Sequence, residues 1–143
     1  MNLNTPRIRA NFDLCTGCDI CRLECSLHKQ GGYNPRQALL RLESKNQGLT
    51  VFPVVCHQCD NAYCLQVCPY GAIERDSTLG IPLIDKNRCR KCGLCISYCP
   101  LQVITTGDEG QAIKCDLCGG EPRCVEACPV GALTLVQEVN RNE

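Results

Sequence analysis

Apolar residues occur along this chain in short runs, each bounded by glycine, proline, cysteine or polar residues. Runs of this length predict short strands, at Ile8–Phe12, Leu40–Glu43, Leu49–Val55, Ile81–Asp85 and Leu133–Val136. Lys45–Gly48 separates two of these runs and predicts a hairpin. Cys21–Gln30 is predicted to form a helix that ends at Gly31. The polar ends, Met1–Arg7 and Gln137–Glu143, are expected to be frayed.

The predicted elements repeat in a fixed order: a short strand, a cysteine loop, a cysteine-bearing turn of helix and a second short strand. Gly71–Ile73 and Gly131–Leu133 occupy equivalent places in two of the repeats. Self-similarity of this kind indicates an internal duplication.

All sixteen cysteines belong to four quartets, and each quartet has three residues before its last cysteine. Proline follows the last cysteine in three quartets, and two quartets have a longer middle gap. Four closely spaced cysteines ending in Cys-Pro are typical of bacterial [4Fe–4S] ferredoxins. The quartets are Cys15, Cys18, Cys21 and Cys25; Cys56, Cys59, Cys64 and Cys68; Cys89, Cys92, Cys95 and Cys99; and Cys115, Cys118, Cys124 and Cys128.

The composition is consistent with an inorganic interior. The 143 residues include 4 Tyr, 2 Phe and no Trp, so a core of large side chains would be poor. We expect four clusters to occupy the interior and the cluster-free chain to be largely unfolded. The formal charge is zero, but four clusters with thiolate ligands would add about −8. Basic residues beside the cysteines either offset this charge or are ordinary surface charges: Arg88, Arg90, Lys91, Lys114 and Arg123.

Several classes of protein are not indicated. The chain has no apolar run long enough for a membrane span, and no nucleic-acid partner is expected. Met1–Asn11 lacks the apolar region of a signal peptide and a twin-arginine pair. The expected location is therefore cytoplasmic, with export beside a signal-bearing partner as the alternative.

The spacing favours cubane clusters over other uses of cysteine. The fourth cysteine of a quartet lies roughly 6 Å beyond the third along a helix, and in two-cluster ferredoxins it binds the other cluster. Zinc sites usually pair two C-x2-C units, and a disulfide scaffold requires an oxidising compartment. A zinc-stabilised interaction module remains an alternative that colour would test.

The four quartets resemble those of four-cluster, ferredoxin-type electron-transfer subunits of anaerobic oxidoreductases. The resemblance covers Phe12–Leu135. That group includes subunits of dimethyl-sulfoxide-reductase-type enzymes, formate dehydrogenases, hydrogenases, carbon monoxide dehydrogenases, tungsten aldehyde oxidoreductases and benzoyl-CoA reductases. The motifs that carry the resemblance are Cys15-Thr-Gly-Cys18, Cys56-His-Gln-Cys59-Asp-Asn-Ala-Tyr-Cys64, Cys92-Gly-Leu-Cys95 and Cys115-Asp-Leu-Cys118-Gly-Gly-Glu-Pro-Arg-Cys124.

The resemblance implies an α+β fold of two pseudo-symmetric, bacterial-ferredoxin-like halves around four [4Fe–4S] clusters. Residues 1–50 together with 106–143 would form one half, and residues 51–105 the other. The implied ligands are crossed between quartets. The four sets are Cys15, Cys18, Cys21 and Cys128; Cys115, Cys118, Cys124 and Cys25; Cys56, Cys59, Cys64 and Cys99; and Cys89, Cys92, Cys95 and Cys68.

The resemblance also implies a non-catalytic electron-transfer subunit. Its partners would be a large catalytic redox subunit, best a tungsten or molybdenum enzyme, and a flavin or NAD subunit or a ferredoxin. The segment from Cys25 to Pro35 is most similar to the aldehyde oxidoreductase and carbon monoxide dehydrogenase types. The alternatives are a free polyferredoxin and a subunit of a carbon monoxide dehydrogenase, hydrogenase or benzoyl-CoA reductase. Self-association into a longer wire is a further hypothesis.

A few residues depart from this pattern or carry other hypotheses. Ser26 replaces the proline expected after Cys25, so the first helix can continue to Gln30. His28 and His57 could bind metal or move protons, although ordinary polar residues are the simpler interpretation. Asp116 and Glu126 could form a docking surface or a solvated face, and the sequence leaves both interpretations open. With every cysteine assigned to a cluster, no catalytic residue is predicted.

Overall fold

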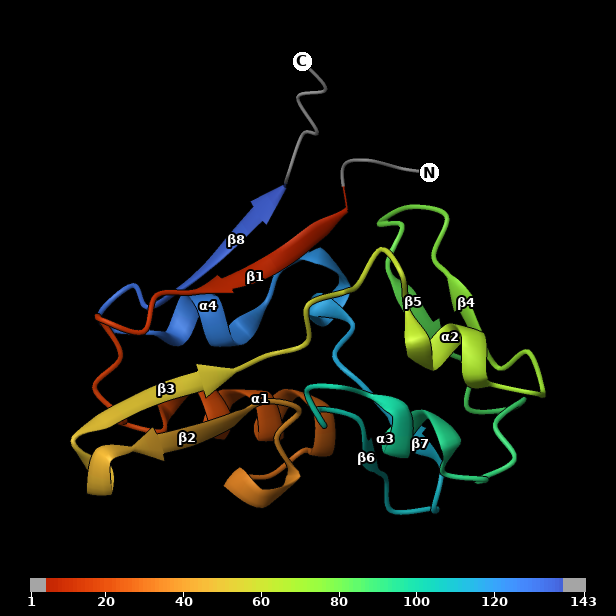
Figure 1. The fold of residues 1–143 in the computed structure, drawn as a ribbon, viewed down its shortest axis with the longest axis horizontal. Helices are drawn as coiled ribbons and strands as arrows, with labels where there is room; N and C mark the ends of the chain where they lie inside the picture. The colour runs from red at the N-terminus through yellow and green to blue at the C-terminus, as the bar shows by residue number, and fades with distance from the viewer. Residues whose placement is uncertain (1–4, 138–143) are drawn as a thin grey trace.

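The computed structural model describes residues 5–137 (Figure 1). Within that range the chain forms short strands, four α-helices and three short 3-10 segments. The strands are β1 (Pro6–Ala10), β2 (Arg41–Lys45), β3 (Thr50–Val54), β4 (Ile73–Arg75), β5 (Pro82–Ile84), β6 (Thr105–Thr106), β7 (Ala112–Ile113) and β8 (Leu133–Gln137). The α-helices are α1 (Ile20–Gln30), α2 (Tyr63–Val67), α3 (Leu94–Tyr98) and α4 (Arg123–Ala127). The 3-10 segments are η1 (Pro35–Gln37), η2 (Asn46–Gly48) and η3 (Leu117–Gly120).

The strands pair as four separate antiparallel sheets of two strands each. Three of these sheets join neighbouring strands: β2 with β3, β4 with β5, and β6 with β7. The fourth joins β1 to β8, with Ile8 opposite Leu135, and so brings the first and last described elements together (Figure 1).

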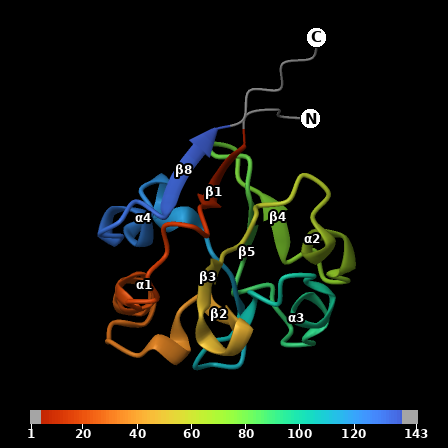
Figure 2. The same cartoon turned by 60° about the vertical axis from the view of Figure 1, so that its left-hand side comes forward.

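The helices associate in the same nested order. The outer helices α1 and α4 pack against each other, as do the inner helices α2 and α3. Figure 2 shows the outer pair on one side of the molecule and the inner pair on the other. The first quartet is therefore placed beside the fourth, and the second beside the third.

Two clusters of buried side chains follow this division. The larger cluster gathers cysteines of the outer helices with Ile8, Leu133 and residues that reach it from the middle of the chain, such as Val55 and Ile81. The smaller cluster is built on the inner helices and sheets, around Ile73, Cys95, Ile104 and Ala112. Both contain cysteines, so the apolar core and the cysteine-lined regions are continuous.

The helix α1 is longer than the other three because no proline follows its last cysteine. It has 11 residues against 5 in each of α2, α3 and α4. Ser26 is fully buried, and its hydroxyl donates to the Leu23 carbonyl at 2.8 Å and accepts from the Asn34 N–H at 3.0 Å. The prediction that α1 continues past Cys25 to Gln30 is confirmed.

Most predicted elements are present, with one correction. The hairpin across Lys45–Gly48 is confirmed, and Gly31 ends α1 with a φ of 77°. Met1–Arg7 and Gln137–Glu143 were expected to be frayed. This is wrong for Pro6 and Arg7 of β1 and for Gln137 of β8, because these two strands pair. The rest of the predicted frayed ends, Thr5 aside, lies outside the described residues. Among residues 5–137 no helix is both long and apolar enough to cross a bilayer.

Candidate iron–sulfur sites

Each cysteine loop contains the same backbone feature. The residue immediately before the second cysteine of every quartet has a positive φ: 75° at Gly17, 47° at Gln58, 61° at Lys91 and 55° at Leu117. This left-handed conformation is unfavourable for residues other than glycine by about 1–2 kcal/mol. It reverses the chain between the first two cysteines, so both thiols can point to the same side.

Proline sets the direction of three of the four last cysteines. Cys68, Cys99 and Cys128 follow the final helical residue and have extended backbones, with ψ of 110°, 118° and 114°. A residue before proline is excluded from the helical region by the proline ring. The fourth such cysteine, Cys25, is instead inside α1.

Three of the four predicted ligand sets each line one hollow of the structure. We name these site A, site C and site D, and we name the fourth set site B. Site A is lined by Cys15, Cys18, Cys21 and Cys128; site C by Cys56, Cys59, Cys64 and Cys99; and site D by Cys68, Cys89, Cys92 and Cys95. Site B consists of Cys25, Cys115, Cys118 and Cys124.

The thiols of site B also lie close together. Burial raises the pKa of the Cys124 thiol, and negative charge on Cys115, Cys25 and Cys118 raises it further. Cys25 and Cys124 are buried, on helices that pack against each other. The crossed sets predicted from the resemblance are thus brought together in space.

The buried thiols are costly to ionise without a cation. Burial is the largest effect, and it raises the pKa of Cys21 and Cys95 to about 11 and that of Cys115 to about 12. Cys128 differs, because the backbone N–H groups of residues 130–133 outweigh burial and lower its pKa. Iron binding requires thiolates, and a cationic iron–sulfur core would supply the missing positive charge.

Backbone amides donate hydrogen bonds to three of the sulfurs. The donors are the Leu39 N–H to Cys25 Sγ at 3.3 Å, the Leu117 N–H to Cys115 Sγ at 3.4 Å, and the Ala132 N–H to Cys128 Sγ at 3.3 Å. Hydrogen bonds to cluster sulfurs are among the features that set reduction potentials.

Charge coupling between thiols also connects neighbouring sites. Cys21 of site A raises the pKa of Cys124 in site B, after the effect of burial. Cys56 of site C acts likewise on Cys115 of site B, and Cys64 of site C on Cys95 of site D. The sites therefore follow one another in the order A, B, C, D.

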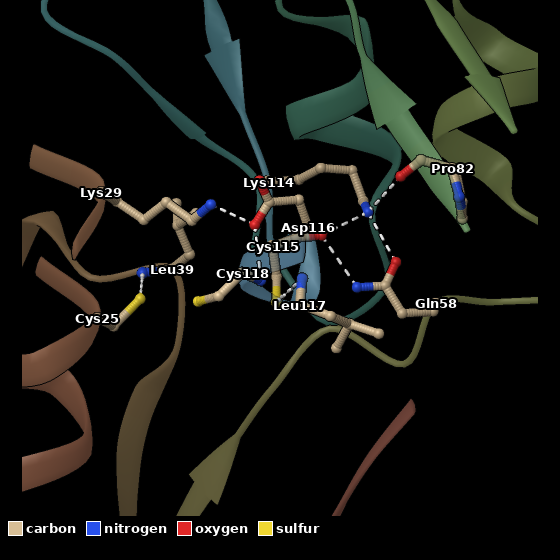
Figure 3. A network of polar contacts seen from close by, with 10 residues as sticks. All are labelled: Cys25, Lys29, Leu39, Gln58, Pro82, Lys114, Cys115, Asp116, Leu117 and Cys118. Carbon is tan, nitrogen blue, oxygen red and sulfur yellow. Dashed lines mark hydrogen bonds and ion pairs between the residues drawn. The ribbon is translucent and has the colours of Figure 1, made fainter. Parts of the chain in front are cut away.

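A buried polar network lies where sites B and C meet (Figure 3). Lys114 is 6% exposed, and its ammonium donates hydrogen bonds to Gln58, Pro82 and Cys115. On the other side of the Cys115 loop, Asp116 pairs with Lys29 of α1 and accepts from the Cys118 N–H at 2.9 Å. Burial acts to raise the pKa of Asp116, but the contacts with Lys29 outweigh it and hold that pKa below its usual range.

These contacts answer some of the open questions about polar residues. Lys114 is buried near the thiols, whereas Arg88, Arg90, Lys91 and Arg123 are exposed.

The two acidic residues differ in their surroundings. Asp116 is half-buried in an ion pair with Lys29, whereas Glu126 is exposed. Sequence reasoning gave no role to Gln58, which lies between Cys56 and Cys59 in one of the quoted motifs and is fully buried.

The donor set of each site fits a cubane better than a single ion. Among residues 5–137 no three His, Cys, Asp or Glu side chains converge on one metal position. A [4Fe–4S] cluster is held by four thiolates on four iron atoms, and four cysteines spread around a hollow match that requirement. His28 and His57 are exposed. A cavity of about 550 Å³ is lined by His57 and by residues of strands β1, β2 and β3, with no cysteine among its lining residues.

Comparisons with known proteins agree with this donor set. Residues 48–138 match the family model of the 4Fe-4S dicluster domain, and residues 12–32 match a 4Fe-4S binding domain. The polyferredoxin-like subunit of an aliphatic sulfonate oxidoreductase from Pyrococcus furiosus is 37% identical over 118 residues, covering 81% of this chain and 67% of that protein. The thiosulfate reductase electron transfer subunit PhsB of Salmonella typhi is 37% identical over 133 residues, covering 83% and 69%.

A solved structure is similar across the whole fold. One chain of the active-site complex BamBC of benzoyl coenzyme A reductase, solved with zinc, aligns with a TM-score of 0.55 and 25% sequence identity. The alignment covers 97% of this chain and 82% of that chain.

Proposed function

Because the chain belongs to the 4Fe-4S dicluster domain family, we propose that it is a non-catalytic electron-transfer subunit of an oxidoreductase complex. It would relay single electrons between a catalytic subunit and a second redox partner. Relatives named as subunits of a sulfonate oxidoreductase and of a thiosulfate reductase support this role. When bound, [4Fe–4S] clusters supply one-electron carriers.

We propose four clusters, held by sites A, B, C and D in the crossed arrangement. The observation that carries this proposal is that three hollows are each lined by the four cysteines of one predicted set. The crowding of Cys25, Cys115 and Cys118 around Cys124 supports the same arrangement for site B.

The order of the sites supports a linear relay. Of the sixteen cysteines, Cys18 and Cys92 are exposed, and they belong to the terminal sites A and D. The interior sites B and C contain buried or half-buried cysteines. We propose that electrons enter and leave at sites A and D and that sites B and C insulate the middle of the path.

We also propose that sites A and B form one ferredoxin-like half and sites C and D the other. The pairing of α1 with α4 and of α2 with α3 supports this division. The boundaries at residues 50 and 106 come from the quartet order, and the β2–β3 hairpin crosses the first of them.

For the catalytic partner we propose a tungsten or molybdenum aldehyde oxidoreductase, on the resemblance of residues 25–35 alone. In the structure this segment covers the end of α1 and the connection to η1, and the Asn34 N–H donates to the Ser26 hydroxyl. A benzoyl-CoA reductase is the second candidate, favoured by the similarity to a BamBC chain. Co-purification with a large tungsten or molybdenum protein would support a fixed subunit, whereas isolation of the chain alone would favour a free polyferredoxin.

Iron and sulfide analysis tests the cluster content. Anaerobically prepared protein should be brown and contain about sixteen iron and sixteen sulfide per chain, as four [4Fe–4S] clusters require. Zinc in place of iron would refute the proposal.

Paired serine variants test the crossed ligands. Cys128→Ser should perturb the same electron paramagnetic resonance signal as Cys18→Ser. A sequential arrangement would instead make Cys128→Ser match Cys118→Ser.

A further inference from the structure

Lys114 connects the two interior sites in an unusual way. It follows β7 and directly precedes Cys115 of site B, yet its side chain lines the hollow of site C. The ammonium is buried with the side chain, and Figure 3 shows it pointing away from Cys25 and toward Gln58 and Pro82.

The three donors of the ammonium all reach oxygen acceptors. Nζ donates to Gln58 Oε1 at 2.8 Å, to the Pro82 carbonyl at 2.6 Å and to the Cys115 carbonyl at 2.8 Å. The Gln58 amide in turn donates from Nε2 to the same Cys115 carbonyl at 2.9 Å. Lys114 and Gln58 thus tie the loop of site C and strand β5 to the loop of site B.

These acceptors are all neutral, so the positive charge itself is not balanced by them. No carboxylate among residues 5–137 forms an ion pair with Lys114. A buried ammonium without an opposite charge is strongly unfavourable. Burial raises the pKa of Cys115 and Cys64, and the Lys114 charge acts in the opposite direction on both, so thiolates of sites B and C lie within reach of that charge.

We propose that Lys114 is a positioning residue for electron passage between sites B and C, and that its charge favours the reduced state of both. This inference rests on the proposed function. A neutral side chain could supply the hydrogen bonds, but only a cation stabilises the extra negative charge that reduction adds. When one electron passes between the two sites, one is oxidised, the other is reduced, and the ammonium remains between them with its proton.

Two variants of the full-length, cluster-loaded protein separate the effect of the Lys114 charge from the effect of its hydrogen bonds. Lys114→Gln removes the charge and retains hydrogen-bond donors. Lys86→Gln is the matched control, because it removes the same charge from an exposed lysine outside the four quartets. Redox titrations followed by electron paramagnetic resonance would give the four midpoint potentials, and serine variants of Cys59 and Cys118 would identify the signals of sites C and B.

In Lys114→Gln the signals of sites B and C should shift to lower potential, and those of sites A and D should not. We expect the reduced-to-oxidised ratio at a fixed potential to fall about tenfold, which is 59 mV for a one-electron couple. Unchanged potentials, equal to those of Lys86→Gln, would overturn the proposal.

A second variant covers the case in which Lys114→Gln fails to bind clusters. Gln58→Glu keeps Lys114 and nearly the same shape but places a carboxylate beside the ammonium, so the same two signals should shift downward. Cluster loss in both variants would overturn the role in setting potentials and leave Lys114 as a folding element. Failure of the proposed function is distinguishable, because the unmutated protein would then lack four [4Fe–4S] clusters.

Discussion

Replacing Ser26 with alanine should weaken the protein far more than a surface serine would. The Ser26 hydroxyl makes two hydrogen bonds, to the Leu23 carbonyl at 2.8 Å and from the Asn34 N–H at 3.0 Å, with no exposure to solvent. The second bond holds the connection after α1, whose Leu39 N–H reaches Cys25 Sγ at 3.3 Å. Replacing Ser26 should therefore loosen the connection after α1 that packs over Cys25.

The expected magnitude follows from these contacts. Each hydrogen bond contributes about 1 kcal/mol. The Asn34 N–H retains a second acceptor, the Gly32 carbonyl at 3.1 Å, so no desolvation cost of an unpaired donor is added. Alanine recovers about 0.5 kcal/mol through its higher helix propensity. The net loss is about 1.5 kcal/mol, or roughly a tenfold faster opening of this region.

Cluster loss is irreversible, so the measured quantity is a rate. The assay follows the decay of the brown absorbance in guanidinium under anaerobic conditions. Ser97→Ala is the matched control, because the Ser97 hydroxyl also donates to a helical carbonyl, that of Gly93 at 3.2 Å, but is exposed. That control should change stability by less than about 0.5 kcal/mol. Equal decay rates for the two variants would refute the reasoning.

Three other perturbations have definite expected results. Gly17→Ala should cost about 1–2 kcal/mol and selectively weaken site A, seen as iron loss, because Gly17 has a φ of 75° and an added Cβ would lie 3.2 Å from Val51. Gln102→Gly should slow denaturant-induced bleaching, with a gain of about 0.5–1 kcal/mol, because exposed Gln102 has a φ of 54°. Iron retention against a chelator should strengthen as the pH rises from 6 toward 9. Burial raises the pKa of Cys21 and Cys95 to about 11, so both thiols must release protons to bind iron. Iron retention that does not change with pH would contradict this.

The elements with strong local signals were predictable from the sequence. Gly31 ended α1 as expected, and the absence of proline at Ser26 predicted the extra length of that helix. The cysteine spacing and the resemblance together predicted which thiols would lie near one another. Proline and glycine act within one or two residues of themselves, which is why such features can be read locally.

Features that depend on distant partners were not predictable. Pro6 and Arg7 join a strand only because β8 supplies a partner from the other end of the chain. The burial of Lys114 and Gln58 depends on β5 and on two cysteine loops meeting. Left-handed backbones at Gln58, Lys91 and Leu117 follow from the loop closure, since these residue types do not favour that conformation.

The pairing of α1 with α4 and of β1 with β8 has a consequence for biosynthesis. A ribosome makes the chain from the N-terminus, so Cys15, Cys18 and Cys21 emerge long before Cys128, with which they line one hollow. Sites C and D contain only cysteines between residues 56 and 99, and both sets are complete while α4 is still untranslated. Cluster insertion can therefore begin in the middle of the nascent chain, whereas the first three thiols must stay reduced until α4 and Cys128 have been synthesised.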